Sequence, residues 1–144
     1  MTVLDAYAVV AFLRAEPAAT QVAGLLTRGS CTTTATGLAE VIDRLVRLDG
    51  ADEDDVAADL AELGLLDAIP VDGALALDAG RLRARHHHWI RRAVSLADCV
   101  LAAAARLLGE PLATSDPHLL DLCHDEGIAV AVLPASDGQI WKRS

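Results

Sequence analysis

The chain has 144 residues, 53% of them hydrophobic, and a formal net charge of −9. This length suits one domain over residues 1–144, and the hydrophobic fraction excludes a disordered chain. The negative charge argues against a simple nucleic-acid coat protein. No apolar run approaches the roughly 20 residues that a membrane-spanning helix needs, and the N-terminus lacks the basic start of a signal peptide. Three widely spaced cysteines without a C-x-x-C pair predict a reduced, cytoplasmic protein.

Short apolar strands are predicted to alternate with helices along the chain. The N-terminal part predicts a strand at 2–4, helices at 6–14 and 18–28, a strand at 31–34 and a helix at 36–48. The middle part predicts a helix at 52–63, a brief extended stretch at 68–71, a helix at 72–85 and a basic loop that ends at 94. The C-terminal part predicts a helix at 95–108, a strand at 111–114, a helix at 116–126 and a strand at 128–133. This alternation predicts an α/β fold with a parallel sheet of about four or five strands and helices on both faces.

Four carboxylates stand where such a sheet would bring them together. Asp5 and Asp116 lie just beyond predicted strands, while Glu40 and Asp98 lie early in predicted helices. Because strand ends and helix starts meet at one edge of a parallel sheet, we expect the four side chains to share a pocket. Each acid also has a structural interpretation. Asp5, Asp98 and Asp116 have the positions of helix N-terminal caps, and Glu40 is spaced to pair with Arg44.

The acids taken together indicate a metal site. Carboxylates in contact repel one another, and their pKa values rise unless a cation neutralises them. The spacing supplies no cationic side chain of matching strength, so a divalent ion is the expected counter-charge. Mg²⁺ and Mn²⁺ prefer oxygen ligands. A metal ion held in this way can activate a water molecule and stabilise charge on a phosphodiester, which predicts hydrolysis of a phosphate ester.

These residues and their contexts resemble the PIN-domain ribonucleases, and specifically the VapC-type toxins of VapBC toxin–antitoxin modules. The matching segments occur in the family's order and span nearly the whole chain: Val3–Asp5 with Ala8–Leu13, Thr33–Ala35 with Leu38–Val41, Leu96–Ala105, and Leu112–Asp116. The resemblance implies a three-layer α/β/α fold and a Mg²⁺- or Mn²⁺-dependent endoribonuclease, usually a homodimer. It also implies that the catalytic and metal-binding acids are Asp5, Glu40, Asp98 and Asp116, and that Thr114 positions a ligand or a carboxylate.

The same resemblance implies a substrate and a partner. The leading hypothesis is a toxin that cuts a structured RNA, such as a tRNA, and is silenced by a cognate VapB-type antitoxin. The helices at 18–26 and 56–66 would then form a groove for the antitoxin. One departure from the family is Ala6, which stands where a Ser or Thr commonly follows the first Asp.

A basic segment precedes the helix that carries Asp98. Five of the twelve Lys and Arg residues fall between Arg81 and Arg92. One interpretation is a solvated helix end and loop. The other is a contact with RNA phosphates, which should weaken as salt rises, and it favours Arg85, Arg91 and Arg92 as the contacting residues. Trp89, inside this segment, is interpreted as a loop anchor rather than as an RNA-stacking residue.

Three other functions remain open from the sequence. A PIN nuclease could process RNA outside a toxin–antitoxin pair, and a catalytically silent PIN fold could serve only for binding. A phospho-acceptor receiver domain also uses acids at strand ends. It needs a pair of acids after the first strand and a lysine after a late one, whereas Asp5 stands alone and the one lysine is Lys142.

Overall fold

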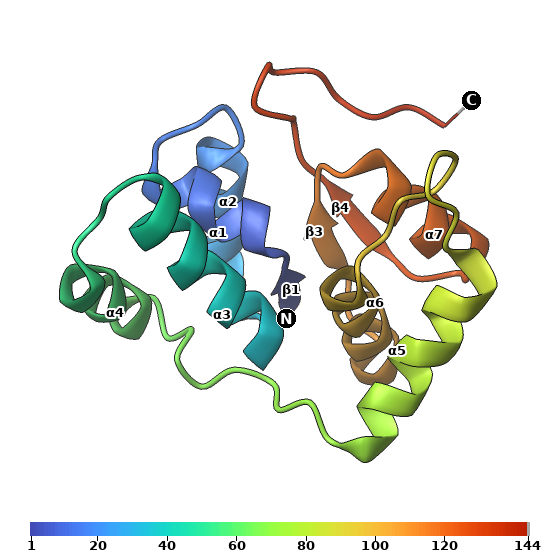
Figure 1. The fold of residues 1–144 in the computed structure, drawn as a ribbon. Helices are drawn as coiled ribbons and strands as arrows, with labels where there is room; N and C mark the ends of the chain where they lie inside the picture. The colour runs from blue at the N-terminus through green and yellow to red at the C-terminus, as the bar shows by residue number, and fades with distance from the viewer. Residues whose placement is uncertain (144) are drawn as a thin grey trace.

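The central element of the fold is a four-stranded parallel sheet in the order β2-β1-β3-β4 (Figure 1). The structure is a computed structural model, and it describes residues 1–143. The strands are short and apolar: β1 (Thr2–Leu4), β2 (Cys31–Thr32), β3 (Leu112–Thr114) and β4 (Val130–Val132). Because all four strands run in the same direction, their carboxyl ends lie along one edge of the sheet.

Helices cover both faces of this sheet (Figure 1). One face carries α1 (Ala6–Leu13), α2 (Ala19–Arg28), α3 (Ala35–Asp43) with the π-helical turn η1 (Arg44–Leu48), and α4 (Glu53–Glu62). The other face carries α5 (Gly73–His86), α6 (Leu96–Leu108) and α7 (Pro117–Asp125). The predicted three-layer α/β/α architecture is therefore confirmed.

The sheet lies between two hydrophobic cores, one on each face, and β1, β3 and β4 each contribute side chains to both. Val3 and Leu112 pack with α5, α6 and α7, whereas Leu4 and Ala113 pack with α1 to α4. Successive residues of a strand point to opposite faces, so two or three residues per strand are enough to contact both helical layers. Fully burying one leucine contributes about 1.5–3 kcal/mol. Packing on both faces thus holds the strand ends, and with them the site, in fixed positions.

The structure departs from the sequence-based prediction in two places. The extended stretch predicted at 68–71 contributes only one parallel bridge, between Thr34 and Ile69. The helix predicted at 36–48 is interrupted, because its last turn widens into η1 beginning at Arg44. Such widened turns change the direction of the side chains that follow them, and they are frequent at functional sites. Separately, no helix among residues 1–143 is long and apolar enough to cross a membrane.

Candidate active site

Asp5 is the buried centre of the site. It follows β1 directly, and its Oδ1 accepts a hydrogen bond of 2.7 Å from the backbone N–H of Ala8, which caps α1. Only 6% of the residue is exposed. Burial penalises the ionised form and raises the pKa of Asp5 to about 7. The carboxyl therefore exchanges its proton near neutral pH, far above the ordinary range of an aspartate.

Thr114 connects Asp5 to Asp116. Its fully buried hydroxyl, at the end of β3, hydrogen-bonds the Asp5 carboxyl and lowers the pKa of Asp5, opposing the effect of burial. The same oxygen accepts a bond of 3.1 Å from the backbone N–H of Asp116. Ala6 is buried beside this site. The hydroxyl that orients Asp5 thus comes from Thr114, because residue 6 is an alanine and has no hydroxyl.

Asp98 and Asp116 approach from the starts of two helices. Asp98 closes a capping box with Ser95, each backbone N–H lying 3.0 Å from the other residue's side-chain oxygen. Asp116 Oδ1 accepts a bond of 2.8 Å from the N–H of His118 and caps α7. Both structural interpretations are correct. A carboxylate has about four acceptor positions, so capping by one oxygen leaves the other available to a ligand.

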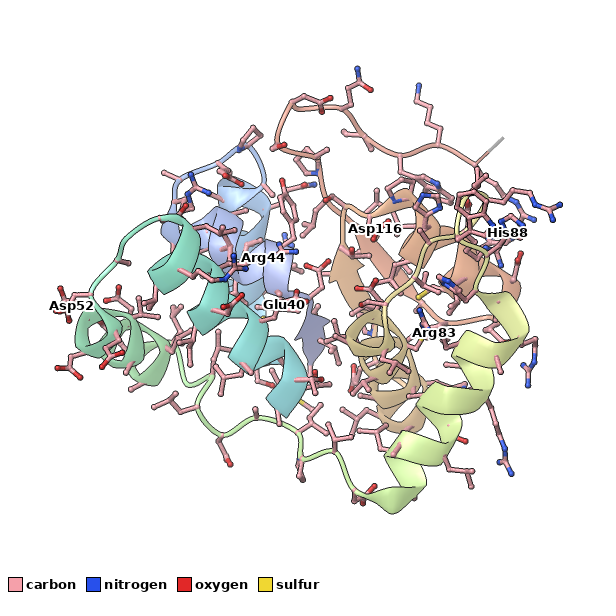
Figure 2. All side chains as sticks on the ribbon, in the orientation of Figure 1. Glu40, Arg44, Asp52, Arg83, His88 and Asp116 are labelled. Carbon is pink, nitrogen blue, oxygen red and sulfur yellow. The ribbon has the colours of Figure 1, made fainter. Side chains whose placement is uncertain are left out.

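The fields of the four acids overlap. Asp98 and Asp116 both raise the pKa of Asp5, although less than burial does. Burial also raises the pKa values of Asp98 and Glu40, with further increases from Asp116 and from Asp98 respectively. In Figure 2, Glu40 lies on the α3 side of this edge and Asp116 on the β3 side. The structure therefore brings all four predicted acids to one region.

Arg44 corrects the expectation that no cationic side chain would accompany the acids. Its Nη2 lies 3.7 Å from Glu40 Oε2, and its charge lowers the pKa values of both Glu40 and Asp98. The first residue of η1 therefore supplies a guanidinium beside the carboxylates (Figure 2). The sequence signal for this pair was the i,i+4 spacing, which also describes an ordinary surface ion pair. Arg44 differs from an ordinary surface pair in that it also influences a second acid, Asp98.

The acids have the chemistry of a divalent-metal site but are not closed around one. Among residues 1–143, no three His, Cys, Asp or Glu side chains are close enough to hold a metal ion. All four donors are carboxylates, as Mg²⁺ and Mn²⁺ prefer. Mg²⁺ commonly keeps several waters and uses only one or two protein carboxylates. The donor set therefore fits such an ion. Asp5, Asp98 and Asp116 are the candidate ligands, because the charges of Asp98 and Asp116 raise the pKa of Asp5 and the charge of Asp116 raises the pKa of Asp98.

Two of the five arginines of the basic segment are paired with acids at the end of α7. Arg85 Nη1 lies 2.5 Å from Glu126 Oε1, and Arg92 Nη2 lies 2.8 Å from Asp125 Oδ2. Hydrogen bonds from His86 and then from Arg85 lower the pKa of Glu126, and a hydrogen bond from Arg92 lowers the pKa of Asp125. Arg91 is exposed and forms no ion pair within the described part of the chain. Of the three predicted phosphate contacts, Arg91 is therefore the one whose charge is not neutralised by an acid of the described chain.

The fold and the site together define an α/β protein whose site lies at the carboxyl edge of a parallel sheet. The chain belongs to the PIN-domain family, whose model matches residues 2–125. The resemblance predicted from the sequence is confirmed at this level. No curated protein matches the chain significantly.

Three solved structures share this fold. FitAcB from Neisseria gonorrhoeae is 21% identical, with a TM-score of 0.66 over 90% of this chain and 96% of that one. A toxin–antitoxin complex from Klebsiella pneumoniae is 14% identical, with a TM-score of 0.62 over 81% of this chain and 87% of that one. FitAB bound to the IR36 DNA fragment is 21% identical, with a TM-score of 0.66 over 91% and 94%.

The raised pKa of Asp5 predicts a stability that falls as pH rises. The folded protein binds this proton more tightly than the unfolded chain, so the stabilisation is complete below about pH 4 and is lost as pH rises through about 7. Asp5→Asn keeps the capping oxygen but cannot ionise. We expect it to increase the free energy of unfolding at pH 8 by up to about 4 kcal/mol, with little change at pH 4. Urea unfolding in EDTA measures this difference. Asp52→Asn, at the exposed cap of α4, is the control, and an equal effect of Asp5→Asn at both pH values contradicts the prediction.

Removing the Arg44 charge should raise the pKa values of two acids at once. We expect Arg44→Gln to raise those of Glu40 and Asp98, because its field lowers both in the wild type. Carboxyl chemical shifts followed by NMR against pH report the change. Arg47→Gln is the matched control, since Arg47 lies in the same turn but pairs with exposed Asp43 at 2.9 Å. A titration of Glu40 that stays the same in Arg44→Gln would remove Arg44 from the site.

Proposed function

We propose that this protein is a Mg²⁺- or Mn²⁺-dependent endoribonuclease that acts as the toxin of a type II toxin–antitoxin pair. Membership of the PIN-domain family, whose proteins are generally nucleases, supports nuclease chemistry. The observation that carries the proposal is the convergence of Asp5, Glu40, Asp98 and Asp116, with raised pKa values for the first three. Unusual carboxyl pKa values of this kind are typical of catalytic sites.

Different residues of the site would have different roles in phosphodiester hydrolysis. One or two of the carboxylates of Asp5, Asp98 and Asp116, together with water molecules, would hold the metal ion, which when bound supplies positive charge for the phosphate oxygens and lowers the pKa of water. Thr114 orients the Asp5 carboxyl. A carboxylate of the pocket that does not bind the ion can accept the proton of the attacking water. The Arg44 guanidinium donates to the phosphate oxygens.

A groove on the side of the molecule formed by α1 to α4 supports an antitoxin partner. It lies between the end of α1 and α4 and is lined by Phe12, Leu13 and Leu63, with Asp59 and Glu62 beside them. An amphipathic helix with a basic flank would match this surface. Two of the similar structures, at 14% and 21% identity, are described as a toxin–antitoxin complex and as FitAB bound to DNA. An adjacent small gene whose product binds the chain and stops RNA cleavage would support the toxin role over an RNA-processing role. Light scattering tests the proposed homodimer.

Removing one negative charge from the acidic pocket should strongly lower RNA cleavage without unfolding the protein. We expect Asp98→Asn and Asp116→Asn to lower RNA cleavage roughly 100-fold or more, because each loses a negative charge in the pocket. Both should stay folded, since asparagine accepts the same capping hydrogen bonds. Cleavage of labelled RNA with Mg²⁺ or Mn²⁺ is the measurement, and EDTA should stop it.

Matched controls come from two helix caps away from the pocket. Asp52 and Asp72 cap α4 and α5 through the same kind of hydrogen bond, so Asp52→Asn and Asp72→Asn make the same chemical change elsewhere. These variants should cleave RNA like the wild type. If Asp98→Asn and Asp116→Asn also cleave like the wild type, the four acids are not the active site.

Metal binding has a readout that is independent of cleavage. At pH 8 the ionised pocket should bind Mg²⁺ or Mn²⁺, and an ion at 100 times its Kd stabilises the folded state by about 2.7 kcal/mol. We expect the melting temperature of the wild type to rise with the divalent salt, compared with NaCl of equal ionic strength. The rise should be much smaller in Asp5→Asn and unchanged in Asp52→Asn. Equal stabilisation of the wild type and Asp5→Asn would place the ion elsewhere.

A further inference from the structure

The segment between α5 and α6 forms a small hydrogen-bonded hairpin at residues 88–92. The backbone N–H groups of His88 and Arg92 each donate to the other residue's carbonyl at 2.9 Å. The His88 ring Nδ1 accepts the backbone N–H groups of Ile90 and Arg91 at 3.2 and 3.0 Å. Four hydrogen bonds thus hold five residues, and the tip consists of Trp89, Ile90 and Arg91.

The base of the hairpin is fastened to the body of the protein. Arg92 reaches Asp125 at 2.8 Å and His86 Nδ1 at 2.9 Å. His87 Nδ1 and Arg83 Nε both lie 3.1 Å from the carbonyl oxygen of Val94. Arg92 is therefore occupied in positioning the hairpin, which corrects its predicted role as a free phosphate contact. The tip residues make no ion pair within the described part of the chain.

Trp89 is presented to solvent at this tip. The chain has only four Trp, Tyr and Phe residues, yet 77% of Trp89 is exposed, as is 61% of neighbouring Ile90. Its ring lies nearly parallel to that of His88, at 16° and 6.5 Å between centroids. The interpretation of Trp89 as a loop anchor is therefore wrong. A tryptophan held in place by its neighbours but not covered by them presents a large aromatic face for binding.

The surroundings of Trp89 suit a polyanion. Between Asp78 and Asp98 the chain has five arginines and three histidines and no acidic residue, although the protein carries 21 acids in all. The hairpin leads into Ser95, which caps the helix that carries Asp98. Figure 1 shows the hairpin, in yellow, at the same end of the molecule as the starts of α6 and α7. A strand leaving the acidic pocket on this side would meet positive charge and an aromatic face together.

We propose that Trp89 stacks on an unpaired base of single-stranded RNA, while Arg91 contacts the phosphate next to it. This subsite rests on the proposed ribonuclease function and adds to it a binding contact outside the acidic pocket, made with an unpaired base. Bases in a duplex are already stacked on one another, whereas unpaired bases can turn out onto an aromatic side chain. Stacking of this kind accepts any base, so Trp89 selects an unpaired segment and not a sequence.

Equilibrium binding tests the subsite directly. In an Asp98→Asn background with Mg²⁺, Trp89→Ala should weaken binding of a single-stranded RNA 12-mer about 5- to 100-fold. It should change binding of the same sequence in a duplex by less than twofold. Trp89→Phe, which keeps an aromatic ring, should recover most of the affinity. Leu107→Ala removes another exposed apolar side chain, at the far end of α6 from Asp98, and is the control that should leave binding unchanged. Circular dichroism melting should be unaffected, because Trp89 is exposed.

Fluorescence gives a second, local readout. In Trp141→Phe the one remaining tryptophan is Trp89, and single-stranded RNA should quench it more strongly than inorganic phosphate or duplex RNA does. His88→Ala removes the acceptor that holds the tip, and it should weaken quenching and binding together. His88→Asn should restore both, because an asparagine oxygen accepts backbone N–H groups two and three residues on.

The outcomes separate this proposal from the proposed function. If the wild type cuts RNA and Trp89→Ala binds and cuts it equally well, the subsite is wrong and the nuclease function stands. If the wild type cuts no RNA but single-stranded RNA quenches Trp89, the subsite stands and the nuclease function fails. If Trp89→Ala changes the oligomeric state of the protein in solution but not its binding of RNA, the tip is a protein–protein contact and the proposal is overturned.

Discussion

The burial of carboxylates at the strand ends, made more unfavourable by their mutual repulsion, is the constraint on which the site depends. Asp5 is almost fully buried next to two other acids, and its raised pKa records how unfavourable its charge is there. The fold opposes this repulsion with helix N-termini. Asp5 caps α1, Asp116 caps α7 and Asp98 lies in the first turn of α6. Each helix end presents unpaired N–H groups and a partial positive charge, so three of them together stabilise negative charge at this edge. The same three ends would also favour a bound phosphate.

The structural and functional interpretations of these acids are therefore the same arrangement. A capping residue must follow a strand and open a helix, and in a parallel sheet that position lies at the ligand-binding edge. This is why the sequence could predict the convergence of Asp5, Asp98 and Asp116 from local signals alone. Alternation of strands and helices likewise predicted the layers and the parallel sheet. The prediction depended on topology, which is set by short-range patterns, and not on side-chain geometry.

Features that depend on distant partners could not be predicted in this way. Arg85 and Arg92 are paired with Glu126 and Asp125, which lie more than 30 residues further along the chain, and no local pattern indicates that pairing. Arg44 pairs with Glu40 at i,i+4 spacing, which describes exposed pairs equally well, and its effect on Asp98 depends on the folded chain. The exposure of Trp89 depends on hydrogen bonds around His88 that composition does not reveal.

The negative net charge of the protein opposes RNA binding, so the contacts that the hairpin offers matter for affinity. With a net charge of −9, the chain repels RNA at long range, and the acidic pocket repels it at short range. A bound divalent ion would neutralise the pocket but would attract any phosphate, paired or unpaired. Attraction to RNA over other anions must therefore come from a contact with bases, and stacking adds binding free energy that salt does not screen. Trp89 is the most exposed of the chain's four Trp, Tyr and Phe residues and lies in its most basic segment, so the hairpin can supply affinity that the rest of the surface opposes.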